Sequence, residues 1–132
     1  MDKLKECTKE QKLAILSSLQ MISEGSESQS KLNAQEKMIQ NILIDFNITQ
    51  TDWDKHIDSL NPQNFQKTLK SLSIVENEFY LSYIFELLHQ NGKPTSREEA
   101  VAKNACLNIS GISNEKFNQT MDKLKNLGRF FS

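Results

Sequence analysis

Apolar residues recur at spacings of three and four along most of the chain, which is typical of helices that bury one face. All four glycines and both prolines lie between these periodic segments, where helices usually end. No segment of comparable length alternates apolar and polar residues with the period of two that strands show. The pattern predicts an all-α fold of about seven helices.

The first three helices are predicted at 9–22, at 33–46 and in a short segment around 53–60. Asn33 with Glu36 three residues later forms a capping-box-like start for the second, after a polar loop at 26–31. The predicted buried faces of these helices carry large apolar side chains: Leu13, Ile15, Leu16, Leu19, Ile22, Met38, Ile39, Ile42, Leu43, Phe46, Trp53, Ile57 and Leu60.

Four further helices are predicted at 62–71, 74–90, 97–110 and 114–127. Each follows residues typical of a helix start: Asn61 with Pro62, Ser73 with Glu76, Ser96 with Glu99, and Ser113. Segment 74–90 is apolar around much of its circumference, so we expect it to be the central helix. Gly128 is expected to end the last helix.

The two halves of the chain resemble each other in sequence. Segment 33–46 aligns with 96–109 and repeats its glutamate and its apolar positions. With one extra residue in the second copy, the turn 47–49 then aligns with 111–113, and each turn is followed by an aromatic residue. We therefore expect one domain over 1–132, with repeat one at about 9–60, a connector helix at about 61–72 and repeat two at about 73–128.

This arrangement resembles the TerB-like family, a set of all-helical domains named after a tellurite-resistance protein and also joined to J-domain co-chaperones. Family members repeat an apolar helix, an Asp-Gly loop, a helix opened by Glu and a Gly-Ile/Leu-Ser/Thr turn. Here Glu24-Gly25 and Asn91-Gly92 take the loop positions, over a match that spans about 9–127. The resemblance implies two helical units packed around a central apolar helix, in a stress-response protein.

The resemblance also implies a divalent-metal site where the loop acids meet, with Glu24, Glu36, Asn91 and Glu98 as ligands. Carboxylate and amide oxygens suit hard cations such as calcium and magnesium, and no other cofactor is expected. Glu24 and Asn91 replace the Asp of the family pattern, which weakens such a site or removes it. The competing interpretation is that Glu36 and Glu99 cap helices while Glu24 and Glu27 are solvated.

The charge balance excludes a strongly basic binder, because 16 Lys and Arg face 17 Asp and Glu for a net charge of -1. We therefore expect no nucleic-acid binding. The longest apolar stretch, 79–88, contains Ser82 and Glu86 and is far shorter than the roughly 20 residues of a membrane span. The first residues lack the apolar run of a secretory signal, so the expected location is cytoplasmic, without stable membrane insertion.

Catalytic and zinc-binding motifs are absent from the sequence. Cys7 and Cys106 lie far apart, and neither has a Cys or His at ligand spacing. His56 and His89 lie in different halves, and no serine sits in a G-x-S-x-G motif or a Gly-rich phosphate loop. The chain is predicted not to be an enzyme.

Charged residues are unevenly placed, which bears on partners. Asp45, Asp52, Asp54 and Asp58 surround the third helix, whereas Lys116, Lys123, Lys125 and Arg129 make the C-terminal end basic. These are either solvated faces or a complementary contact, with a protein partner or between copies of the chain. The terminal Phe130 and Phe131 either fold back onto the core or anchor a partner.

The predicted function is that of a non-enzymatic TerB-like helical domain, which serves as a protein-interaction or stress-response module. The alternative is a metal-binding or metal-sensing protein of the tellurite-resistance type, which uses the acidic loops between its helices.

Overall fold

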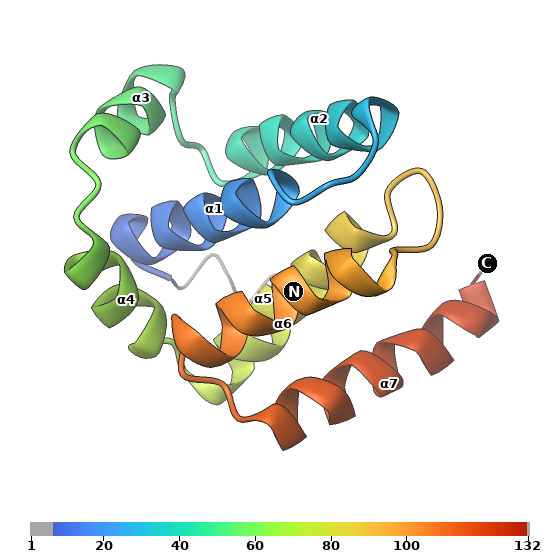
Figure 1. The fold of residues 1–132 in the computed structure, drawn as a ribbon. Helices are drawn as coiled ribbons and strands as arrows, with labels where there is room; N and C mark the ends of the chain where they lie inside the picture. Colours follow the sequence, from blue (N-terminus) through green and yellow to red (C-terminus); the bar gives the residue numbers. More distant parts are fainter. Residues whose placement is uncertain (1–6, 132) are drawn as a thin grey trace.

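A computed structural model describes residues 7–131 of the chain, with side chains as far as Asn126. Over this range the chain forms seven α-helices and no strand, which confirms the predicted fold class (Figure 1). Their bounds are α1 Lys9–Ser23, α2 Gln29–Asp45, α3 Gln50–Asp58, α4 Pro62–Lys70, α5 Ile74–Leu88, α6 Ser96–Asn108 and α7 Asn114–Phe131. Across the described residues, no helix is both long enough and apolar enough to span a bilayer.

Helix α2 begins four residues before the predicted start. Ser28 is its N-cap, and the Ser28 hydroxyl accepts a hydrogen bond from the backbone N–H of Lys31 at 3.2 Å. Helix α6 is capped by Thr95 and Glu98, one residue before the predicted pair, with both hydrogen bonds of a capping box in place. The predicted starts at Asn33 and at Ser96 were therefore wrong, because hydroxyls just upstream satisfy the first N–H groups.

The sequence predicted that the last helix ends at Gly128, but helix α7 continues to Phe131. A glycine inside a helix costs about 1 kcal/mol relative to alanine but leaves the backbone hydrogen-bonding pattern intact. It ends a helix only where the chain also turns away. The side chains of Arg129, Phe130 and Phe131, and residue 132, lie outside the described residues.

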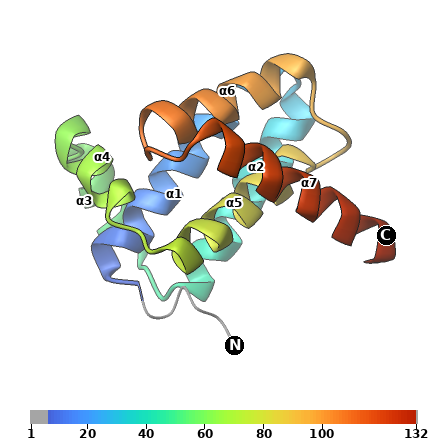
Figure 2. The same cartoon turned by 90° about the horizontal axis from the view of Figure 1, so that it is seen from below.

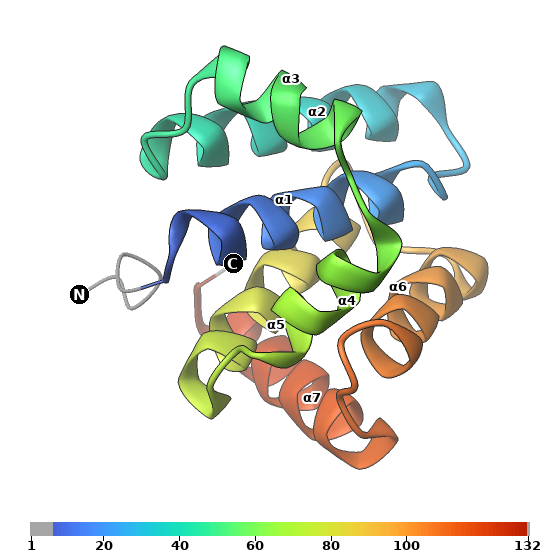
Figure 3. The same ribbon diagram turned by 90° about the vertical axis from the view of Figure 1, so that its left-hand side faces the viewer.

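Helices α1 and α5 share the centre of the fold, whereas the sequence predicted α5 alone. Helix α1 packs against α2, α3, α4, α5 and α6, and α5 packs against α1, α6 and α7. Figure 3 shows α1 between α2 and α5, with α4 alongside. The burial of α1 is underestimated by its apolar pattern because Ser17, Ser18 and Ser23 are buried with its leucines.

Ile57, a predicted core residue, is 41% exposed, since the short α3 packs mainly on α1.

The buried face of α5 is tied to its neighbours by a tyrosine hydroxyl. Tyr80 is fully buried, and its hydroxyl shares a hydrogen bond with Ser18 of α1 and accepts one from Ser110 at 3.3 Å. Burial raises the pKa of Tyr80, and it also raises the pKa of the nearby Cys106 thiol to about 12. Both groups are therefore neutral at physiological pH, and Cys106 is an unreactive core thiol.

The turns that follow α2 and α6 each contain one residue in the left-handed region. Asn47 and Gly111 have φ angles of 58° and 73°, in the left-handed region. The next residue in each turn, Ile48 or Ile112, is 7% exposed. Its N–H closes the preceding helix on the carbonyl oxygen of Leu43 or Cys106. This is the pair of turns that aligned in the sequence.

Candidate functional site

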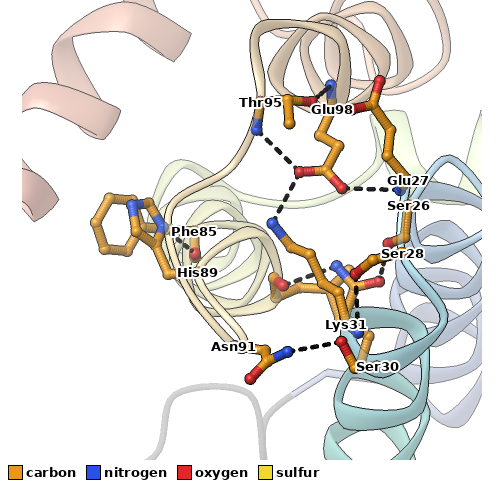
Figure 4. Close-up of polar contacts among 12 residues, drawn as sticks. Ser26, Glu27, Ser28, Ser30, Lys31, Phe85, His89, Asn91, Thr95 and Glu98 are labelled. Carbon is orange, nitrogen blue, oxygen red and sulfur yellow. Dashed lines mark hydrogen bonds and ion pairs between the residues drawn. The ribbon is translucent and has the colours of Figure 1, made fainter.

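The start of α2 meets the start of α6 at a buried ion pair (Figure 4). The ammonium of Lys31 lies 2.8 Å from Oε1 of Glu98, and the two side chains are 7% and 5% exposed. Lys31 and Glu98 each occupy the third position of a helix, α2 and α6 respectively. The N-terminal turns of two helices far apart in sequence are thereby held together.

Three donors surround the Glu98 carboxylate. Besides Lys31, it accepts hydrogen bonds from the backbone N–H groups of Thr95 at 2.9 Å and Glu27 at 3.0 Å. Burial raises the pKa of Glu98, but the hydrogen bonds from Lys31, Thr95 and Glu27 outweigh burial and hold that pKa below its ordinary value. The carboxylate is therefore charged and neutralised by Lys31.

Polar contacts extend from this pair toward the end of α5. The Gln35 side chain donates to the carbonyl oxygen of Leu87 at 2.9 Å and accepts from the Ser26 hydroxyl. The amide of Asn91 donates to the Ser30 hydroxyl at 3.0 Å. The loop after α1 and the first turns of α2 are thus joined to the end of α5 and the start of α6 by paired polar groups.

The described residues predicted to bind a metal do not form one cluster of ligands. Glu24 is exposed at the C-cap of α1, Glu36 is exposed on α2, and Asn91 contacts Ser30. Glu98 is buried against Lys31. Within the described residues, no group of three or more His, Cys, Asp or Glu side chains is arranged to hold a metal ion. The arrangement does not favour cation binding, since the Lys31 ammonium already compensates the buried carboxylate of Glu98.

We expect calcium, magnesium, manganese and zinc, each up to about 1 mM, to leave the amide resonances of 24–36 and 91–99 without a shared saturable shift. The reason is that Lys31 occupies the cation position at Glu98. An NMR titration of the metal-free protein measures this. Saturable shifts in both loops that disappear in Glu36→Gln would contradict the expectation and establish the metal site.

The sequence did not identify Lys31 as a functional residue, because it predicted a polar loop at 26–31. One local signal was present. Helix α2 has no acidic residue in its first turn and carries a lysine there, which the helix dipole disfavours. A cation at a helix N-terminus needs a compensating acid, and Glu98 supplies it from α6.

His56 lies in a hollow of about 650 Å³ between α1, α3 and α4. Its Nε2 atom is 2.8 Å from the hydroxyl of Ser17. That hydroxyl donates to the carbonyl oxygen of Leu13 at 2.8 Å, so Nε2 donates to Ser17 and its tautomer is fixed. Because Ser17 is 2% exposed and its proton is already engaged, this contact is structural rather than a serine nucleophile with its base.

A second hollow, of about 470 Å³, lies between α5, α6 and α7 and is called the α5–α7 groove below. Figures 1 and 2 show α7 as the outermost helix on this side, with its C-terminal half diverging from α6. The groove is lined by apolar and charged side chains from three helices and one loop: Phe85, Leu88, His89, Pro94, Ser96, Glu99, Ala100, Lys103, Phe117, Asn118, Met121, Asp122 and Lys125.

The floor of the α5–α7 groove is largely apolar and is partly buried in the core. Phe85 and His89 stack with ring centroids 4.1 Å apart, and His89 Nδ1 donates to the Phe85 carbonyl oxygen at 2.8 Å. This hydrogen bond leaves His89 Nε2 as the acceptor of the neutral ring. Leu88 and Met121 are 4% and 8% exposed, so they are held by the core as well as facing the groove. The groove therefore combines an apolar floor with a charged rim.

The uneven charges predicted from the sequence are partly paired within the fold. Asp52 of α3 binds Lys9 at 2.7 Å, and Lys116 of α7 binds Glu78 at 3.3 Å. Hydrogen bonds from Lys9 and Thr49 lower the pKa of Asp52. Both ion pairs are largely exposed, so they contribute little to stability.

Comparisons of the chain with protein-family models, with curated proteins and with solved structures found no match. A function therefore has to be argued from the residues and their geometry.

Proposed function

We propose that this chain is a non-enzymatic protein-interaction module that binds an amphipathic helix of a partner protein in the α5–α7 groove. The observation that carries the proposal is the apolar floor of Phe85, Leu88 and Met121 beneath a rim of charged side chains. Amphipathic helices bind in such grooves through large apolar side chains spaced three and four residues apart. The groove volume of about 470 Å³ has room for a few such side chains.

The state of the titratable groups supports a binding role over catalysis. Asp52 and Glu76 have pKa values lowered chiefly by hydrogen bonds from Lys9 and Cys7, and Glu98 is neutralised by Lys31. A general acid needs the opposite shift. His56 donates to the buried Ser17 hydroxyl, whose own proton is held by Leu13, so the two side chains do not form a serine nucleophile with its base.

We further propose that the chain is TerB-like, with two helical repeats at about 9–60 and 73–128, and that it acts in the cytoplasm in a stress response. The matching turns at Asn47 and Gly111 support the repeat. So do Trp53 and Phe117, which follow these turns and are each 7% exposed. An experimental structure tests the repeat, since the two segments should superpose helix for helix.

The binding proposal is tested with a synthetic helical peptide that carries leucine at positions i, i+3, i+4 and i+7 and only alanine and glutamine elsewhere. We expect saturable NMR shifts at groove residues such as Phe85, Ala100 and Asn118, with a dissociation constant below about 1 mM. Ala100 is exposed on the groove wall, so Ala100→Arg should weaken binding at least about tenfold without unfolding the protein.

The matched control is Asn104→Arg, which adds the same side chain on the same helix at an exposed position that does not line the groove. It should leave the dissociation constant unchanged. Shifts that spread over other faces, or equal losses in Ala100→Arg and Asn104→Arg, would overturn the assignment of binding to the groove. Sedimentation without peptide shows separately whether a second copy of the chain fills the groove.

A further inference from the structure

The two walls of the α5–α7 groove carry balanced charge, and we propose that the groove selects an amphipathic partner helix whose two flanks each carry both a basic and an acidic residue. This inference rests on the proposed function, because it specifies the partner of the same groove.

Each wall contributes one acid and one base. On α6, Glu99 lies one turn before Lys103, and on α7, Asp122 lies one turn before Lys125. Among the residues whose side chains the structure describes, none of these four makes an ion pair with an opposite charge. Charges of a partner are therefore free to pair with all four.

The order of the charges is reversed between the walls. Figure 1 shows that α6 and α7 run in opposite directions on either side of the turn that joins them. Moving toward that turn, the α6 wall presents Glu99 and then Lys103, whereas the α7 wall presents Lys125 and then Asp122. A partner helix that pairs with every charge must match this order, read in the same direction toward the turn. Its flank beside α6 must carry a basic and then an acidic residue, and its flank beside α7 an acidic and then a basic residue.

The same pattern argues against other occupants. A polyanion such as a nucleic acid would meet Glu99 and Asp122 in a groove without net positive charge. The grooves of two copies placed face to face would leave both apolar floors unfilled, because each surface is concave. A convex helix with mixed charge satisfies the floor and the rim together.

Three peptides of the same apolar pattern test the inference, one with both charges on each flank, one with only lysine and one with only glutamate. We expect the mixed-charge peptide to bind about tenfold more tightly than either single-charge peptide, because two repulsive contacts become attractive. In 0.5 M NaCl the advantage should fall to about twofold or threefold, since the rim is exposed and screened by salt.

Reversing the rim acids should switch the preference. Glu99 and Asp122 are exposed, so the double variant Glu99→Lys/Asp122→Lys should fold and should bind the all-glutamate peptide most tightly, by about tenfold. The control variant Asp45→Lys/Asp58→Lys makes the same change in net charge at exposed positions on α2 and α3. It should keep the wild-type preference.

The outcomes separate this inference from the proposed function. Equal binding of all three peptides in the groove, or a preference that switches equally in both double variants, would overturn charge selection while the groove remained a helix-binding site. Absence of groove shifts with the neutral peptide and with all three charged peptides would overturn the proposed function itself. Concentration-dependent dimerisation through the groove would show a second copy in place of a partner helix.

Discussion

Lys31→Met is expected to lower the free energy of unfolding by about 3–5 kcal/mol, because it leaves the Glu98 carboxylate buried without its counter-charge. The intact ion pair contributes no more to stability than an apolar contact of similar volume would. Removing Lys31 alone is costly, because the buried Glu98 carboxylate then lacks both a counter-charge and hydration. Urea unfolding followed by circular dichroism measures the change. A loss of this size is a large part of the stability of an ordinary small domain.

Two control variants make the expectation specific. Lys9→Met removes the same side chain from the exposed Lys9–Asp52 pair, which has a similar length of 2.7 Å, and should lower the free energy of unfolding far less than Lys31→Met. The double variant Lys31→Met/Glu98→Gln should regain most of the stability lost by Lys31→Met. A glutamine at 98 still accepts the hydrogen bond from Thr95 that completes the capping box. Equal costs for Lys31→Met and Lys9→Met would contradict the role of burial.

The same pair predicts a dependence on acid. The pKa of Glu98 is lower in the folded state than its ordinary value of 4.5. The stabilisation is therefore complete above that value and is lost as the pH falls through the folded-state pKa. Below it, protonated Glu98 leaves the Lys31 ammonium unpaired. We therefore expect the free energy of unfolding of wild type to fall, relative to that of Lys31→Met/Glu98→Gln, as the pH is lowered below 4.5.

Ile84→Ala is expected to destabilise the protein by about 2–5 kcal/mol, because the Ile84 side chain is fully buried on α5 and its truncation leaves a cavity. Part of this loss is the hydrophobic free energy of the apolar atoms that are removed, and the rest is the van der Waals contact that the side chains around the cavity lose. The cost should appear in the midpoint of urea unfolding with little change in slope.

Ile74 offers a control of the same residue type on the same helix. Its side chain is 74% exposed, so Ile74→Ala should change stability by no more than about 0.5 kcal/mol. Similar costs at Ile84 and Ile74 would show that α5 is not a central helix.

The number and order of the helices could be predicted from the sequence because apolar periodicity and N-cap residues are local signals. The start of α6 shows the limit of such signals. Thr95 with Glu98 and Ser96 with Glu99 fit the same motif in adjacent registers. The first register forms, and its glutamate pairs with Lys31, which lies 67 residues away in the chain. No local pattern contains that partner.

The candidate site was less predictable than the fold. Leu88, Phe117 and Met121 are buried, but the apolar periodicity of their helices does not show that they also line an open groove. That property depends on how far α7 stands from α6, which the packing on α5 determines. The loop acids were conspicuous in the sequence, whereas the lysine that neutralises one of them looked like an ordinary surface residue.

The outer position of α7 links binding to local stability. Helix α7 packs against α5 and α6 at one side of the molecule, while α1 and α5 are surrounded by other helices. Detaching α7 therefore costs less free energy than unfolding the whole domain, and it opens the groove of which α7 is one wall. Partner binding and the docking of α7 are therefore coupled. The free energy by which a bound partner stabilises the docked α7 equals the free energy by which docking of α7 strengthens binding of the partner.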